Sequence, residues 1–199
     1  MTLAEALLVA VGLVTAVAAV GAWMAARSSS QATAAMTAIE RRRWHADLTP
    51  QFEVGCRVTS GERAKLRVAL VGPAALDRLD RVTVRIRDDI SGRAPVTPSG
   101  PTAEEIARQV WGPYRFVPGV DGADRTGRSV APFGLLLGDW RPLALERTPS
   151  PTWSTDPAGW RRQYDDHPVR LTLMCAREGD QRWTVPLEIQ VDKGTPPSA

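Results

Sequence analysis

Asp165, Asp166 and His167 place two carboxylates beside an imidazole, the side-chain types that hold a metal ion or transfer a proton. Adjacent residues on a turn point in different directions, so the favoured interpretation is a polar turn before a strand that begins at Pro168. Residues 121–124 (DGAD) have a faint likeness to a calcium loop. They lack the D-x-D-x-D-G spacing and the distal glutamate, and we interpret them as a turn.

No enzyme class is indicated by motif. The sequence has no nucleophile elbow, P-loop, dinucleotide fingerprint or HExxH motif, so it predicts no catalytic residue and no cofactor. His45 lies among Arg43, Trp44 and Asp47 and has no partner that the sequence can identify. Two cysteines and two histidines would form a mixed zinc site only if all four converged, and we predict no metal site.

Tryptophan is abundant, with 7 in 199 residues, and two of the seven are followed directly by arginine. Trp, Tyr and Arg contribute most of the binding energy at protein interfaces, which suggests a candidate interaction face. Its residues are Trp140, Arg141, Trp160, Arg161 and Tyr164. The alternative is that the tryptophans fill a small core with arginine stacked over them, as the phase of Trp183 in its strand suggests.

Charge and composition narrow the class of partner. Lys and Arg number 25 against 22 Asp and Glu, for a net charge of +3, and 43% of residues are hydrophobic. This composition is typical of a folded protein. Residues 48–199 hold 21 basic and 19 acidic side chains with no basic stripe, so nucleic acid is not a predicted partner.

The segment 6–26 (ALLVAVGLVTAVAAVGAWMAA) has no charged side chain and is long enough to cross a bilayer as a helix. A cleaved signal peptide needs a basic start and a shorter apolar run, whereas Glu5 is the only charge before this one. A buried helix of a soluble protein remains the other alternative. Arg27 and Arg41–Arg43 follow the segment, so the positive-inside rule predicts a single-pass protein of the cell membrane with a cytoplasmic carboxyl-terminal domain.

Residues 27–48 are rich in helix-forming residues and predict a helical juxtamembrane stalk, since no proline occurs before Pro50. One seam with alternating steps of four and three could pair two stalks. It comprises Ala25, Ser29, Ala32, Met36, Ile39, Arg43 and Ala46. Its apolar content is poor, so homodimerisation is left open rather than predicted.

Residues 49–193 change from helical to alternating periodicity. Apolar residues alternate with polar ones over 52–58, 65–70, 82–86, 170–175 and 182–191, and shorter strands are expected near 114–117, 133–137 and 143–147. Residues 178–180 read as a hairpin turn, and Pro186 predicts an edge strand or a bulge. About seven short antiparallel strands favour an immunoglobulin-like β-sandwich, with a small barrel as the alternative.

Two short helices and a tail complete the predicted domain. Thr102 and Glu105 form a T-x-x-E capping box before a helix over 103–110, and Asp156-Pro157 begins another that runs to Tyr164. Residues 194–199 read as a disordered tail. Cys56 and Cys175 both fall on the inward phase of their strands, and in a reducing compartment we expect two buried free thiols.

Four runs carry a resemblance to a family: QVWGPYRF at 109–116, GVDGAD at 119–124, GDWRP at 138–142 and WRRQY at 160–164. The chain resembles actinobacterial single-pass membrane proteins of unknown function, in which one membrane helix precedes a domain of this size. The resemblance implies an architecture and no activity. The sequence therefore predicts a non-catalytic protein that is anchored in a lipid bilayer and binds another protein. The alternative is a module for a cell-wall or carbohydrate ligand, if the domain faces outward.

Overall fold

The computed structural model describes Trp23, Arg27 and residues 36–90, 100–179 and 182–194. Apart from Trp23, the predicted membrane segment 6–26 lies outside the described residues, as do residues 195–199 of the predicted tail. In the part of the chain that is described, no helix has both the length and the apolar character needed to cross a membrane. The chain divides between Asp47 and Leu48 into two units. Residues 36–47 of the first unit are helical.

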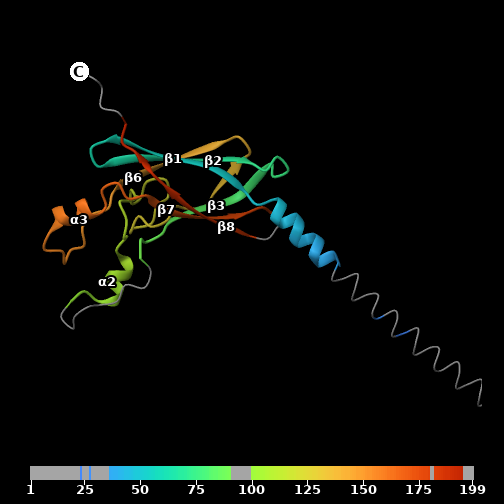
Figure 1. The fold of residues 1–199 in the computed structure, drawn as a ribbon, viewed down its shortest axis with the longest axis horizontal. Coiled ribbons are helices and arrows are strands. Elements are labelled where there is room, and N and C mark those ends of the chain that lie inside the picture. Colours follow the sequence, from blue (N-terminus) through green and yellow to red (C-terminus); the bar gives the residue numbers. More distant parts are fainter. Residues whose placement is uncertain (1–22, 24–26, 28–35, 91–99, 180–181, 195–199) are drawn as a thin grey trace, which may run out of the picture. The chain divides into compact units, whose positions relative to one another are not determined.

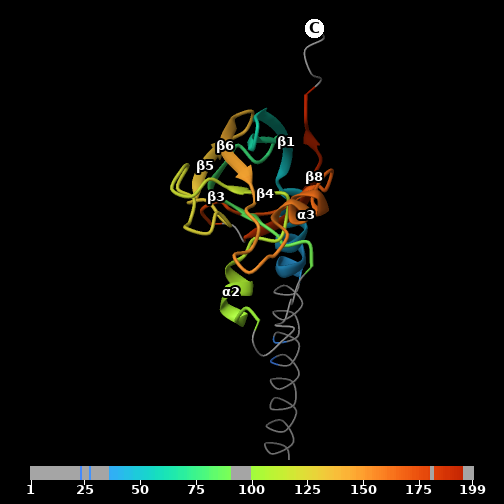
Figure 2. The same cartoon turned by 90° about the vertical axis from the view of Figure 1, so that its left-hand side faces the viewer.

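The second unit is mainly β and contains two sheets (Figures 1 and 2). The first sheet has the strand order β4-β6-β2-β1-β9, and we call it sheet A. Its strands are β1 (Gln51–Ser60), β2 (Arg63–Gly72), β4 (Tyr114–Phe116), β6 (Trp140–Arg147) and β9 (Val191–Asp192). All of its pairs are antiparallel except β1 with β9, where Cys56 is in register with Val191.

The second sheet, sheet B, has the strand order β5-β3-β7-β8. Its strands are β3 (Arg78–Ile86), β5 (Phe133–Leu136), β7 (Val169–Ala176) and β8 (Trp183–Ile189). All of its pairs are antiparallel. Pro186 lies on β8, the last strand of the sheet, which confirms the predicted edge position.

The core lies between the two sheets and has the phase that the sequence predicts. Val84 on β3 and Leu173 on β7 are fully buried, whereas their neighbours Arg85 and Thr172 are not. Trp183 is also buried, so this tryptophan is a core residue. Buried and exposed side chains alternate along these strands because successive side chains point to opposite faces of a sheet.

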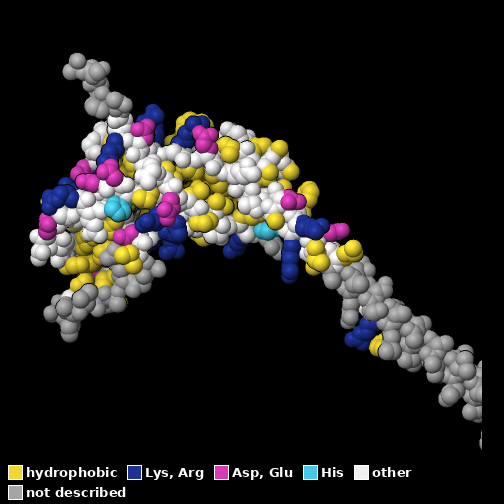
Figure 3. Space-filling model, in the orientation of Figure 1, with side chains coloured by type: hydrophobic (Ala, Val, Ile, Leu, Met, Phe, Trp, Pro, Cys, Tyr) yellow, Lys and Arg dark blue, Asp and Glu magenta, His cyan; other side chains and the backbone are white. Residues whose placement is uncertain are grey.

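One side of the sandwich is less well covered, where β1 and β8 lie on the same side of the domain (Figure 2). Inward-phase residues there are only half-buried, including Val54 on β1 and Val185 and Leu187 on β8. Figure 3 shows hydrophobic side chains between the layer of β1 and β2 and the layer of β7 and β8. This side is open because sheet A continues beyond β1 only with the two-residue strand β9, and β8 is the last strand of sheet B.

Two short helices occupy the connections. Helix α2 (Ala103–Arg108) begins with the predicted capping box: the amide of Glu105 donates to Thr102 Oγ1 at 3.2 Å, and the amide of Thr102 donates to Glu105 Oε2 at 2.8 Å. It ends two residues earlier than predicted, because Gln109 has extended backbone angles. Helix α3 (Pro157–Gln163) begins where Asp156 Oδ1 accepts from the Gly159 amide at 2.7 Å.

Cys56 and Cys175 lie on β1 and β7, one in each sheet. Both are free and buried, with 3% and 2% of their surface exposed. Burial raises the pKa of both thiols to about 12, because a thiolate loses its hydration in the apolar core. A thiol with such a pKa stays protonated at neutral pH and is a poor nucleophile.

Candidate interaction face

The five residues of the sequence-predicted face do not form one surface. Trp160 and Tyr164 on and after α3 are buried, with 9% and 3% exposed. The Trp160 ring contacts Trp111 and Tyr164 edge to face, with centroids 5.2 and 4.9 Å apart. Tyr164 also donates its hydroxyl hydrogen to Asp89 Oδ2 at 3.0 Å. These two aromatics therefore anchor α3 to the sandwich, which is the core alternative, and their rings offer little surface to a partner.

The other three residues lie in separate places. Arg161 is exposed and forms an ion pair with Glu62, with its Nη1 3.2 Å from Oε1. Trp140 begins β6 with 52% of its surface exposed, and the Arg67 guanidinium lies 5.1 Å from the centre of its ring. The Arg141 guanidinium lies 5.5 Å from the centre of the Phe133 ring. Only Trp140 is thus a large aromatic that faces solvent among these five.

Asp165, Asp166 and His167 diverge, as the turn interpretation predicts. Asp165 pairs with Arg147 and Asp166 pairs with Lys193, each at 2.5 Å. The hydrogen bond from Lys193 lowers the pKa of Asp166, and the same contact raises the pKa of Lys193. The His167 ring meets Tyr164 edge to face. Among the described residues, no group of three or more His, Cys, Asp or Glu is placed to hold a metal ion.

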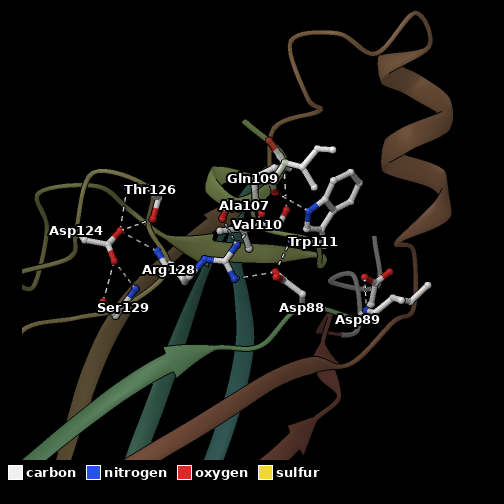
Figure 4. A network of polar contacts seen from close by, with 12 residues as sticks. Asp88, Asp89, Ala107, Gln109, Val110, Trp111, Asp124, Thr126, Arg128 and Ser129 are labelled. Atoms are coloured by element: carbon white, nitrogen blue, oxygen red, sulfur yellow. Dashed lines mark hydrogen bonds and ion pairs between the residues drawn. The ribbon is translucent and has the colours of Figure 1, made fainter. Parts of the chain in front are cut away.

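The loop predicted as a turn at 121–124 is held by Asp124 (Figure 4). Asp124 Oδ1 accepts from the amide and hydroxyl of Thr126, at 2.9 and 2.6 Å, and from the Arg128 amide at 3.0 Å. Its Oδ2 accepts from the amide and hydroxyl of Ser129, at 2.9 and 2.7 Å. Partial burial alone would raise the pKa of Asp124, but these hydrogen bonds lower it to about 2. The carboxylate is therefore occupied by its own loop and is a structural group.

Arg128 extends the same network to the far side of the loop (Figure 4). Its Nη1 donates to Asp88 Oδ1 at 2.9 Å, and its Nη2 donates to the carbonyl oxygens of Gln109 at 2.7 Å and Ala107 at 3.2 Å. The Trp111 amide donates to the same Asp88 oxygen at 3.0 Å. The network joins the end of β3, the end of α2 and the 124–129 loop. Sequence analysis missed it because its members are far apart along the chain.

The outer face of sheet A carries a row of cations on its central strand. Arg63, Lys65 and Arg67 alternate along β2 and are all exposed, and we call these three residues the β2 ridge. Within the part of the chain that the structure describes, none of the three forms an ion pair with an acidic side chain. Two other cations of sheet A do have partners: Arg57 on β1 lies 2.9 Å from Asp192, and Arg115 on β4 lies 2.7 Å from Glu146. The three ridge cations thus have no acidic partner in the described part of the chain.

Hollows lie on both sides of the β2 ridge. On the β1 side, a hollow of about 670 Å³ lies beside Gly55. Its charged lining residues are the cations Arg57, Lys65 and Arg67 and the acids Glu53, Glu188 and Asp192. On the β6 side, a hollow of about 370 Å³ is lined by Arg63, Lys65 and Ala144 among others. Register explains both, because Gly55 stands opposite Arg67 on one side and Ala144 stands opposite Lys65 on the other. Small neighbours leave room beside long side chains.

The alternation over 65–70 predicts a strand with Lys65 and Arg67 on its solvent-exposed side, and the structure extends this strand to Arg63. What sequence analysis missed is that this row lies on a central strand between two hollows and next to Trp140. The only signal for it was three basic residues at alternate positions.

No protein-family model, curated protein or solved structure matches this chain.

Proposed function

We propose that this chain is a non-catalytic, membrane-anchored protein whose β-sandwich domain binds a partner protein through the outer face of sheet A. The observation that carries the proposal is the β2 ridge, three unneutralised cations beside the exposed Trp140. Like charges on one strand face repel each other and reduce stability. An acidic partner surface would relieve that repulsion, and Trp with Arg is the pairing that most often provides binding energy at interfaces.

The membrane anchor is proposed from the uncharged segment 6–26, with the lipid bilayer as the first partner of the chain. Arg27 and Arg41–Arg43 favour a cytoplasmic domain, which is the orientation we propose. Two buried free cysteines are compatible with a reducing compartment. Resemblance to actinobacterial single-pass proteins supports the same architecture.

We further propose that the domain is a variant of the immunoglobulin-like sandwich. The order β4-β6-β2-β1 facing β5-β3-β7-β8 corresponds to the immunoglobulin order D-E-B-A facing C′-C-F-G. Two differences qualify the correspondence: the strand in the D position precedes the one in the C′ position along the chain, and β9 adds a parallel strand beside β1. The cysteines occupy the A and F positions rather than B and F. Sandwiches of this kind serve widely as interaction modules.

A second candidate, a module that binds a carbohydrate ligand outside the cell, is favoured by one observation. The exposed Trp140 ring and the 670 Å³ hollow both adjoin Arg67. Hollows of this size suit a small ligand, and an aromatic ring offers a flat apolar surface to a sugar.

Site-specific photocrosslinking in living cells tests the partner-protein proposal. A benzophenone amino acid replaces Ala144 on the outer face of sheet A and, as the matched control, Thr172 on the outer face of sheet B. We expect a discrete crosslinked protein adduct from position 144, which is lost with Trp140→Ala, and none from position 172. Equal adducts from both positions, or adducts from neither, would overturn the proposal. Adducts from neither position would favour the small-ligand candidate.

A further inference from the structure

We infer that the β2 ridge binds an extended segment of the partner that carries acidic residues at alternate positions. This inference rests on the proposed function and adds the chemistry of the partner. Side chains two positions apart on a strand are about 6.8 Å apart, since each residue rises by about 3.4 Å. A partner segment in the extended conformation has the same repeat. Three of its carboxylates can therefore meet Arg63, Lys65 and Arg67 one for one.

The charges around the ridge favour an anionic occupant. Arg57 on the adjacent strand β1 is already paired with Asp192, and Arg115 on β4, beyond β6, is paired with Glu146. Glu146 on β6 stands opposite Arg63, but it is held by Arg115. Two nearby acids form no ion pair within the described residues: Glu53 stands opposite Ala69 rather than opposite a ridge residue, and Asp121 accepts a hydrogen bond from the Ala144 amide. The ridge therefore presents an excess of positive charge along its own strand.

The surface beside the β2 ridge also has room for the backbone of a bound segment. Gly55 lies opposite Arg67 on β1, and a Cβ atom added there would meet nothing within 4 Å. Pro142 and Ala144 on β6 stand opposite Arg67 and Lys65. Consequently no long side chain stands opposite these two cations on β6, and the hollow on the β1 side has space for a chain lying along the ridge.

Trp140 extends the recognition beyond charge. It stands opposite Ala69, two positions past Arg67 along β2, and its ring already contacts the Arg67 guanidinium. An apolar side chain two positions beyond the acid that meets Arg67 would pack on this ring. The segment is therefore acid-x-acid-x-acid-x-apolar, counted from the residue that meets Arg63.

Fluorescence anisotropy with the full chain in mild detergent tests the inference. The probe is a fluorescein-labelled peptide of three Glu-Thr repeats followed by Leu. A second peptide has the same composition with its glutamates in one block, and an oligothymidylate is the nucleic-acid probe. We expect the alternating peptide to bind at least about fivefold more tightly than the blocked one, and its affinity to fall as salt screens the charges.

Variants separate charge from shape. Lys65→Glu should weaken binding of the alternating peptide at least about tenfold, whereas the double variant Arg81→Glu, Arg85→Glu on the outer face of sheet B should change it by less than about twofold. Gly55→Leu alters no charge and should weaken binding by narrowing the hollow. Thermal melts identify any variant that fails to fold. The binding affinities of the variants that do fold then test the inference.

Three results would overturn the inference: equal binding of the alternating and blocked peptides, equal sensitivity to the sheet A and sheet B variants, or tighter binding of the oligothymidylate. The photocrosslinking result keeps the two proposals distinguishable. A protein adduct at position 144 without binding of the alternating peptide would leave the proposed function standing and reject its acidic segment.

Discussion

Arg128 Nη1 and Asp88 Oδ1 lie 2.9 Å apart, although 40 positions separate the two residues in the chain. The pair is largely shielded from water, with 13% and 26% of the side chains exposed. Arg128 also donates to the carbonyl oxygen of Gln109, so one guanidinium connects the 124–129 loop with the end of β3 and the segment after α2. The contact is a structural brace rather than a reactive centre.

Arg128→Met should therefore lower the free energy of unfolding by about 2 kcal/mol. It removes the donor to two carbonyl oxygens and leaves the shielded Asp88 carboxylate without its cation, with the Trp111 amide as its remaining donor. Urea unfolding followed by tryptophan fluorescence measures the change. Arg125→Met, three positions earlier, is the matched control because Arg125 is exposed, and it should change stability by less than about 0.5 kcal/mol. Equal effects of the two variants would contradict the bracing role.

Asp124 should make stability depend on pH. Its pKa in the folded state is about 2, below the ordinary value of 3.8, so folding favours the charged form. The resulting stabilisation, about 2 kcal/mol, is fully present above pH 3.8 and is lost as the pH falls towards 2. Asp124→Asn should destabilise the domain at pH 7, and the gap from the unmodified protein should shrink below pH 4.

Urea unfolding of both proteins at several pH values between 7 and 2 checks this prediction. Asp139→Asn, on an exposed turn, is the control and should show no comparable gap. A gap of constant size over the whole range would mean that the hydrogen bonds of Asp124 do not distinguish its charged form from its neutral one.

The two cysteines should resist modification while the domain is folded. Cys56 and Cys175 are buried, and their pKa values of about 12 leave almost no thiolate at neutral pH. A mass-tagged maleimide applied to freshly lysed cells should add no tag to the folded protein and two tags after denaturation without reductant. Tags that appear only after reduction would show a disulfide, and would argue against a reducing compartment.

The proposed orientation has a direct test. Alkaline phosphatase fused after Ala199 should be inactive in intact cells, and a fluorescent protein fused at the same place should fluoresce, because the basic flank of segment 6–26 is retained inside. Replacing Arg27 and Arg41–Arg43 by glutamine should weaken this preference. Phosphatase activity from the unmodified flank would reverse the orientation and favour the carbohydrate-binding alternative.

Local sequence signals were sufficient for most elements of the domain. Thr102 and Glu105 predicted the start of α2, Asp156 predicted the start of α3, and alternation predicted the burial of Val84 and Leu173. Each of these signals acts between residues a few positions apart, where backbone geometry alone decides which side chains share a face. The proposed membrane anchor has the same local character and stays a prediction.

Contacts between distant segments were beyond the reach of these signals. The sequence grouped Trp160 and Tyr164 with Trp140, but α3 packs the first two against Trp111 and buries them. The two rings are buried because the segment that contains α3 packs against Trp111. The sequence of α3 alone does not specify that contact. A Trp-Arg pair in the sequence does not indicate whether the tryptophan is exposed or buried.

The sequence by itself determined which residues form strands, which side of each strand is apolar and where the two helices begin. Tertiary structure alone decided that Gly55 and Ala144 flank the β2 ridge, that Trp140 adjoins Arg67, and that no acidic side chain in the described residues neutralises the ridge. The physical reason is that side-chain alternation is a property of one strand, whereas strand order and register come from pairing between distant segments, up to the 135 positions that separate Cys56 from Val191. That pairing places Gly55, Ala144 and Trp140 around the three cations of the β2 ridge.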